Sequence, residues 1–124
     1  MIRLPGTAVI HFHVHAGLPQ VRAFARDQGW FDRGFTELDV AWLELHFTTD
    51  GWATARVLKS TDVPSPITDG WCSLPRVDVG AEVTFAMRAG IVCRAPGDPA
   101  HGMFRDQGDL WFNNDGANYT QTAR

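Results

Sequence analysis

The sequence lacks the features of several common functional classes. Lys59 is its only lysine, and the ten arginines are scattered from Arg3 to Arg124 without forming a basic cluster. Because proteins that bind nucleic acid need a concentrated basic face, we expect no nucleic-acid partner. The sequence also contains no run of about 18 apolar residues, so it predicts no membrane-spanning helix and no membrane partner.

Cysteine is scarce, with Cys72 and Cys93 as its only two copies. Near the start of the chain, Pro5 and Gly6 interrupt any apolar stretch of the kind that a secretory signal needs. We therefore expect a cytoplasmic protein in which both cysteines are buried free thiols, although export would allow the two to pair.

Motifs for catalysis are missing too. The sequence has no Gly-x-Ser-x-Gly elbow, no phosphate-binding loop and no Cys-x-x-Cys pair. Eleven aspartates and three glutamates supply carboxylates, but no motif selects the two that glycoside hydrolysis requires. The sequence therefore gives no support for catalysis and points to no cofactor.

What the chain does contain is enough apolar material for a folded core. With 124 residues, 44% of them hydrophobic, and a net charge of −3, we expect one domain over residues 1–124.

Apolar and polar residues alternate along three long segments, residues 8–16, 38–48 and 82–89, as in half-buried strands. In the second segment the alternation groups Ala41 with Leu43, Leu45 and Phe47, and in the third it directs Val83, Phe85 and Met87 inward. Shorter apolar runs at 53–58 and 110–112 predict further strands, and residues 19–28 predict one short helix that stops at Gly29. Frequent turn signals between these segments favour an all-β fold, an antiparallel, immunoglobulin-like β-sandwich.

Three histidines, His11, His13 and His15, share one face of the first predicted strand, about 7 Å apart in succession. Histidines in this pattern bind zinc or non-haem metals when another strand supplies a further ligand, and His46 or Glu44 could do so. A polar strand face that binds nothing is the more common meaning of the pattern. The alternative function is accordingly a metal-dependent small β-fold enzyme that uses this face.

Tryptophan and asparagine are distributed unusually. There are five tryptophans, and all three asparagines, Asn113, Asn114 and Asn118, lie beside the only tyrosine, Tyr119. A sugar ligand needs flat apolar rings for its C–H faces and amides for its hydroxyls, and this segment supplies both. Asparagine also favours tight turns, so the cluster is equally consistent with a structural turn, and one loop can serve both purposes.

The segment 111–119 resembles the end of the starch- and glycogen-binding modules of carbohydrate-binding family 21 and of the related families 25 and 53. These modules close with a Trp-Asp-Asn-Asn-x-Gly-x-Asn-Tyr motif, which Trp111, Asn113, Asn114, Gly116, Asn118 and Tyr119 match. Two earlier landmarks follow in the same order, Thr48-x-Asp50-x-Trp52 and Asp69-Gly70-Trp71 with the strand 83–88 after it. The resemblance covers residues 43–120, about two thirds of the chain.

This resemblance implies a β-sandwich that binds α-glucan without catalysis. Trp52 and Trp71 are the implied stacking residues, and Asn113, Asn114, Asn118 and Tyr119 would lie near the sugar hydroxyls. Phe112 replaces the aspartate of the motif, which gives either a stacking surface or core packing.

The remaining tryptophans are open to structural interpretations. We interpret Trp111 as a core residue, and Trp42 as either exposed or packed against the helix, while Trp30 is left undecided.

Overall fold

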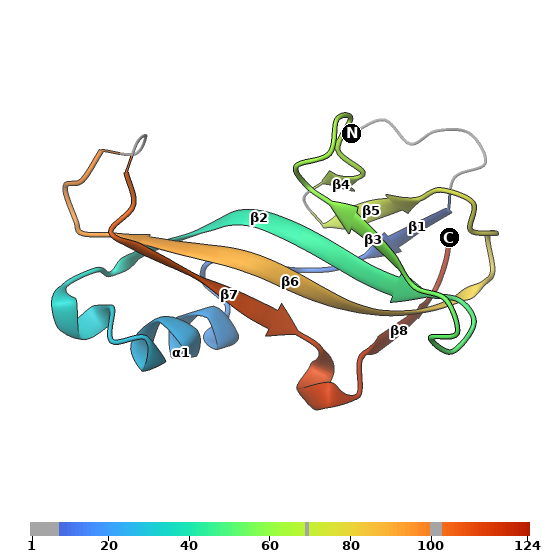
Figure 1. Cartoon of the computed structure of the whole chain (residues 1–124), viewed down its shortest axis with the longest axis horizontal. Coiled ribbons are helices and arrows are strands. Elements are labelled where there is room, and N and C mark those ends of the chain that lie inside the picture. The colour runs from blue at the N-terminus through green and yellow to red at the C-terminus, as the bar shows by residue number, and fades with distance from the viewer. Residues whose placement is uncertain (1–7, 69, 100–102) are drawn as a thin grey trace. The chain divides into compact units, whose positions relative to one another are not determined.

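The computed structural model describes residues 8–68, 70–99 and 103–124, and its strands form two antiparallel sheets (Figure 1). Strands β1, β5 and β4 make the smaller sheet, in that order. The larger sheet has the order β3-β2-β6-β7, and β8 also pairs with β6. The strands have these bounds: β1 Ala8–His11, β2 Glu37–Thr48, β3 Arg56–Lys59, β4 Ile67–Thr68, β5 Trp71–Leu74, β6 Glu82–Arg94, β7 Asp106–Phe112 and β8 Tyr119–Thr122.

Helical structure is limited among the described residues. The α-helix α1 covers Pro19–Asp27, and two 3-10 turns follow later, η1 at Phe31–Arg33 and η2 at Asn114–Gly116. No helix in the described ranges has both the length and the apolar character needed to cross a membrane. The predicted all-β, sandwich-like fold with one short helix is therefore confirmed.

The chain forms two compact units, each described here by itself. The first contains the residues up to His13, Leu43–Arg88 and Trp111–Arg124, and the second contains Val14–Trp42 and Ala89–Leu110.

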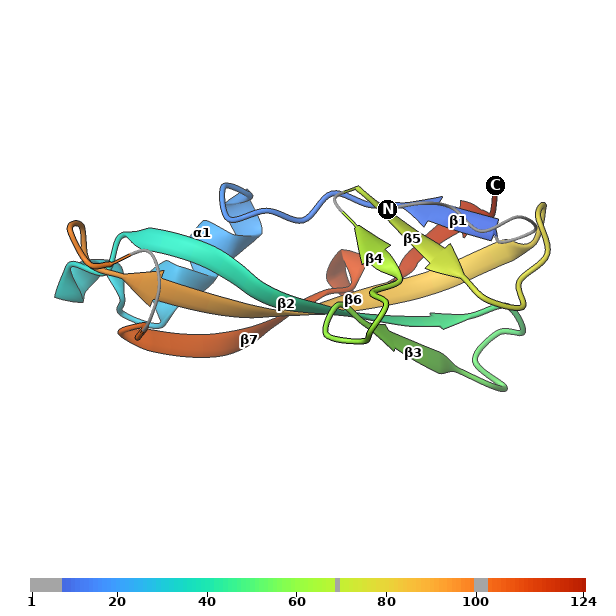
Figure 2. The same ribbon diagram turned by 90° about the horizontal axis from the view of Figure 1, so that it is seen from above.

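The first unit buries its core between two layers of strands (Figure 2). Alternate residues of each strand face inward, as a period of two requires. The most buried inward side chains, each 4% exposed or less, are Ala8, Ile10, Leu45, Phe47, Cys72, Leu74, Val83, Phe85 and Met87.

The end of the chain joins the two layers of this unit. Strand β8 pairs with β6 of the larger sheet. Just beyond it, Arg124 and Val9 of the smaller sheet exchange both backbone hydrogen bonds, at 2.8 and 3.0 Å. Gln121 adds two more bonds between its side-chain amide and the backbone of His11. These four bonds tie β1 to the C-terminal segment.

In the second unit, two aromatic rings pack directly against glycines of the strands. A Cβ atom added to Gly90 would stand 2.1 Å from Nε1 of Trp42, and one added to Gly108 would stand 2.7 Å from Cζ of Phe24. The rings therefore occupy the space that any larger residue at these strand positions would need. Helix α1 carries Phe24, and its Val21 and Ala25 are fully buried.

Several predicted boundaries are wrong. The first strand ends at His11 rather than at residue 16, so His13 and His15 follow it instead of sharing its face. Strand β6 continues five residues beyond Ala89, to Arg94. The short strands β4 and β5 and strand β8 were not predicted, because none has a long alternating run.

The predicted face of segment 38–48 holds only for its second part. Leu45 and Phe47 are buried, but Ala41 is exposed while Trp42 is half-buried on Gly90. Trp42 packs on the sheet at Gly90 and is not an exposed residue, while its packing against the helix stays a prediction. Both cysteines are buried free thiols, as expected, and burial raises the pKa of Cys72 to about 12.

Candidate functional site

Trp111 lies on the outer face of the larger sheet in the first unit. It is 46% exposed, whereas the next residue, Phe112, is 5% exposed. The interpretation of Trp111 as a core residue is therefore wrong, because strand alternation directs Phe112 inward and Trp111 outward. Of the two roles open to Phe112, the structure shows core packing.

The ring of Trp111 is supported from the neighbouring part of the same face. Its centroid lies 4.8 Å from that of His46, with the two planes tilted by 55°. His46 alternates with the buried residues Leu45 and Phe47 along β2, which places it on the outer face. Trp111 and His46 together are called the exposed ring pair below.

A carboxylate stands beside His46. Oε1 of Glu44 lies 3.6 Å from Nε2 of His46 and 3.4 Å from a guanidinium nitrogen of Arg88. The imidazole Nε2 is buried and has no hydrogen-bond partner. His46 thus contacts the ring of Trp111 and approaches Glu44 at 3.6 Å, a distance too long for a strong hydrogen bond.

Residues 113–118, called the asparagine loop, connect β7 to β8 around η2. Oδ1 of Asn113 accepts a hydrogen bond from the backbone N–H of Gly116, and Nδ2 of Asn114 donates to the carbonyl of Asn118. The backbone of Asn114 and Asp115 is left-handed, with φ of 52° and 55°. Asn113 and Asn114 therefore have clear roles in holding the turn.

Asn118 differs from the other two asparagines. Its backbone N–H donates to the carbonyl of Asn113 at 2.8 Å, and its φ is 61°. Within the described residues, its side-chain amide has no hydrogen-bond partner. The loop thus fixes the backbone of Asn118 and leaves a half-buried amide available to bind a ligand.

Tyr119 faces the other side of the sheet. It pairs directly with Phe85, and the two ring centroids are 5.5 Å apart. Phe85 is 4% exposed and belongs to the core. Because directly paired residues point to the same face of a sheet, Tyr119 lies on the covered face and Trp111 on the outer one.

Trp52 projects from a tightly bonded turn between β2 and β3. The side chain of Asp50 accepts hydrogen bonds from the hydroxyl of Thr48 and from the hydroxyl and backbone N–H of Thr54. The Thr48 bond is the largest of the effects that lower the pKa of Asp50 to about 2. The backbone of Trp52 is in the left-handed conformation, with φ of 71°, and the residue is 41% exposed.

Trp71 occupies a third surface. It pairs with His11 in the smaller sheet and precedes Cys72, which is fully buried. Alternation therefore places the half-buried Trp71 on the outer face of that sheet. No ring contact or hydrogen bond in the described residues joins Trp52 or Trp71 to the asparagine loop. Trp111 thus lies on the strand that enters the asparagine loop, two residues before Asn113, and neither Trp52 nor Trp71 has a contact with that loop in the described residues.

The predicted metal face is not assembled by β1, because that strand ends at His11. The described residues contain no group of three or more His, Cys, Asp or Glu side chains that could hold a metal ion. Nδ1 of His15 instead accepts a hydrogen bond from the backbone N–H of Gly17.

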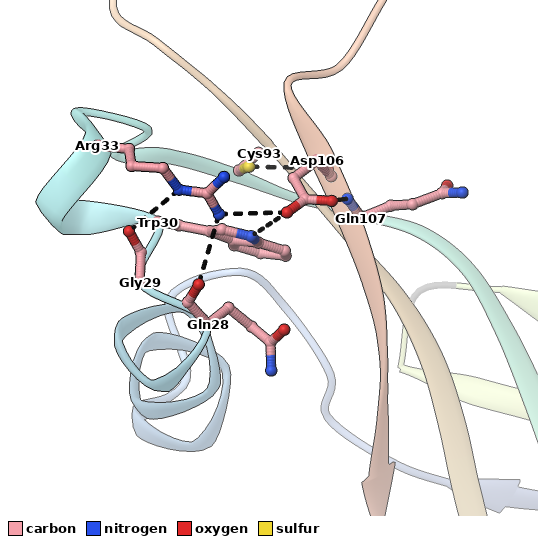
Figure 3. Close-up of polar contacts among 7 residues, drawn as sticks. All are labelled: Gln28, Gly29, Trp30, Arg33, Cys93, Asp106 and Gln107. Atoms are coloured by element: carbon pink, nitrogen blue, oxygen red, sulfur yellow. Dashed lines mark hydrogen bonds and ion pairs between the residues drawn. The ribbon is translucent and has the colours of Figure 1, made fainter.

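Trp30, the tryptophan left undecided, is fully buried in the second unit. Its indole N–H donates to Oδ2 of Asp106 at 3.0 Å, and Arg33 contacts the same oxygen at 3.3 Å (Figure 3). A hydrogen bond from the backbone of Gln107, followed by the one from Trp30, lowers the pKa of Asp106. This arrangement satisfies a buried indole and gives Trp30 a structural role.

Sequence reasoning missed His46 as the partner of Trp111. The alternation already placed His46 and Glu44 opposite Leu45 and Phe47. Which residue of a distant strand would meet them depends on strand order, and β7 lies more than fifty residues further along the chain.

Comparisons of the chain with protein-family models, with curated proteins and with solved structures give no match. The resemblance to carbohydrate-binding family 21 therefore depends on the sequence motifs alone.

Proposed function

We propose that this chain is a non-catalytic module that binds starch- or glycogen-like α-glucan. The observation that carries the proposal is an exposed indole on the strand that leads into the asparagine loop, where Asn118 has a fixed backbone and a side-chain amide without a hydrogen-bond partner among the described residues. The backbone N–H of Asn118 donates to the carbonyl of Asn113 at 2.8 Å, so the loop closes at Asn113, two residues after Trp111. Because consecutive Cα atoms are about 3.8 Å apart, the backbones of Trp111 and Asn118 are separated by less than the length of a short oligosaccharide.

In this proposal the ring of Trp111 stacks on the apolar face of a glucose unit. His46 supports the indole from one side, which reduces the freedom that the ring loses on binding. The amide of Asn118 both donates and accepts hydrogen bonds, as a sugar hydroxyl does. Trp52 and Trp71 remain predicted stacking residues on separate surfaces, and Asn113, Asn114 and Tyr119 support the loop.

The affinity for one oligosaccharide is expected to be weak. A stacking contact and a net hydrogen bond each contribute about 1 kcal/mol, which leaves little after the cost of association. Attachment to a polymer through more than one surface would increase the overall affinity. A cytoplasmic location is part of the proposal, and the two free thiols support it.

The test is calorimetric titration of the full chain with maltoheptaose. We expect the wild type to bind and Trp111→Ala to weaken binding about tenfold, since it removes both stacking and apolar contact area. Phe104→Ala is the matched control, because Phe104 has an exposed aromatic ring (41%) in the second unit, outside the proposed site. Absence of binding by the wild type would refute the proposal.

Trp52→Ala and Trp71→Ala extend the test to the other two surfaces. If either variant weakens binding to amylose while leaving maltoheptaose binding at Trp111 unchanged, that surface contributes a second attachment point. If only Trp111→Ala has an effect with both ligands, the outer face of the larger sheet is the whole site.

A further inference from the structure

A ring nitrogen on the outer face of the larger sheet is buried without a partner. Nε2 of His46 forms no hydrogen bond in the part of the chain that the structure describes. Buried polar atoms are almost always hydrogen-bonded, because leaving one without a partner costs free energy. This nitrogen belongs to the ring that contacts the exposed indole of Trp111, so its protonation state bears directly on the site of the proposed function.

Two side chains surround the imidazole of His46. Its ring centroid lies 4.8 Å from that of Trp111, with the planes tilted by 55°. Oε1 of Glu44 lies 3.6 Å from Nε2. Glu44 precedes His46 by two residues on β2, so strand alternation keeps the carboxylate on the same face. The imidazole therefore has an aromatic ring and a carboxylate as neighbours.

The unpartnered nitrogen becomes a hydrogen-bond donor when the ring is protonated. A neutral imidazole has one N–H, whereas the imidazolium has two. Protonated His46 therefore has an N–H at Nε2, whichever nitrogen holds the proton of the neutral ring. A short movement of either side chain would then turn the 3.6 Å contact with Glu44 into a charge-assisted hydrogen bond.

The same positive charge strengthens the contact with Trp111. A cation within about 6 Å of the centre of an aromatic ring is attracted to the electrons of its face, and the two ring centroids are 4.8 Å apart. Protonation thus draws His46 toward both neighbours at once, and the indole loses part of its freedom to move.

Arg88 of β6 places another positive charge beside Glu44. One of its guanidinium nitrogens lies 3.4 Å from the same Oε1. Arg88 and an imidazolium repel each other, but a carboxylate has two oxygens and about four acceptor positions, so Glu44 can bind both cations. The carboxylate of Glu44 is therefore the group on which the charged form of His46 depends.

Two further charges lie on the strands next to this ring pair. Lys59 of β3 lies opposite Glu44, whereas the residue opposite His46 is the uncharged Val57. Asp109 lies on the same face of β7 as Trp111, by alternation. Both charged side chains are exposed, so water and salt screen them. The contact with Glu44 is thus the main charge interaction of the imidazolium.

We propose that His46 is a positioning residue for Trp111, and that its protonation makes glucan binding tighter at pH 5.5 than at pH 8. Imidazole ordinarily changes charge within this range. The imidazolium, bound to Glu44, fixes the indole, so the ring loses less freedom when it stacks on a sugar. The effect on affinity rests on the proposed function, whereas the effect on the indole does not.

The first test needs no sugar. The indole N–H signal of Trp111 is followed by NMR as the pH of the full chain is lowered from 8 to 5.5, and Trp111→Phe assigns that signal by its loss. We expect one step in the wild type and none in His46→Gln or in His46→Phe, which keeps an aromatic ring but cannot gain a proton. His15→Gln is the matched control and should keep the step, because His15 lies in the second unit and its Nδ1 accepts from the backbone N–H of Gly17.

The second test titrates the full chain with maltoheptaose at pH 8 and at pH 5.5, at constant ionic strength. We expect the wild type to bind about three- to fivefold more tightly at pH 5.5, which is less than one charge-assisted hydrogen bond provides. His46→Phe should bind equally at the two pH values. Glu44→Gln should show a change of about twofold or less, because it removes the carboxylate that the imidazolium contacts. His15→Gln should keep the wild-type ratio.

The proposal is overturned if the indole signal shows no step, if the step remains in the His46 variants, or if the wild type binds maltoheptaose equally at both pH values. If His46→Phe does not fold, His46→Gln serves in its place in the second test. A wild type that binds no maltoheptaose at either pH refutes the proposed function and the effect on affinity with it. The sugar-free step then still decides whether His46 positions Trp111.

Discussion

The two units use tryptophan in opposite ways. In the second unit Trp30 is fully buried with its N–H bonded to Asp106, and Trp42 lies against Gly90. In the first unit Trp52 and Trp111 are 41% and 46% exposed, and Trp71 is half-buried on the outer face of the smaller sheet. A high tryptophan content is therefore not itself a sign of ligand binding. In the second unit Asp106 accepts the N–H of Trp30, and Gly90 leaves room for the ring of Trp42.

The same substitution in each unit gives the largest expected contrast. Trp30→Ala should lower the free energy of unfolding by about 3–5 kcal/mol, because it leaves a cavity and removes one of the hydrogen bonds to Asp106. Trp111→Ala should lower the free energy of unfolding by less than about 1 kcal/mol, because the exposed ring makes few apolar contacts that the substitution could remove. Urea denaturation of both variants measures the difference, and similar losses would contradict the assignment of Trp111 to the surface.

A glycine variant examines the packing in the second unit directly. Gly90→Ala places a Cβ where the indole of Trp42 now lies, so Trp42 must move, at a cost of about 2–3 kcal/mol. Gly108→Ala meets only the tip of the Phe24 ring and should cost less. If Trp42 is the cause, adding Trp42→Ala to Gly90→Ala should be less destabilising than the sum of the two single changes. Strict additivity of the urea-derived free energies would rule this out.

Local sequence patterns predict much of the fold, but they do not predict which residues make up the candidate site. Alternation predicted β2, β6 and the inward direction of Val83, Phe85 and Met87, and Pro19 and Gly29 marked the helix. Alternation also continues past His11, but the partner strand β5 is only four residues long and pairing ends there. The length over which two strands pair depends on both of them, so it cannot be predicted from the pattern of one segment.

The error on Trp111 has a similar origin. An apolar triplet such as 110–112 is consistent with a buried strand, and only the burial of Phe112 shows that Trp111 must point outward. The asparagine cluster forms a turn, which is one of the two meanings that the sequence left open. Its division into two bonded side chains and one free amide depends on φ values and on hydrogen bonds that composition does not specify.

The turn that carries Trp52 should be sensitive to acid. The pKa of Asp50 is about 2 in the folded chain, against 3.8 for an ordinary aspartate. A carboxyl with a lowered pKa stabilises the fold while it is ionised, so its contribution is complete above about pH 4 and is lost as the pH falls toward 2. The Tm of the wild type should exceed that of Asp50→Asn near neutral pH, and the gap should close over this range. A gap that stays constant down to pH 2 would show that charge on Asp50 does not hold the turn.

The smallest expected effect on stability belongs to Asn118→Gly, and it is the most informative about the first unit. Glycine accepts a φ of 61° without a steric penalty but is more flexible when unfolded, so the free energy of unfolding should change by less than about 1 kcal/mol. The variant keeps the backbone bond to Asn113 and removes only the free amide.

If that amide binds a sugar hydroxyl, Asn118→Gly should weaken maltoheptaose binding about fivefold, the equivalent of one net hydrogen bond. Asn114→Gly is the matched control, because it removes an amide that bonds within the loop and should alter stability more than affinity. Unchanged affinity in Asn118→Gly would make all three asparagines structural. The exposed indole of Trp111 would then be the only feature of this loop region that distinguishes the first unit from the second.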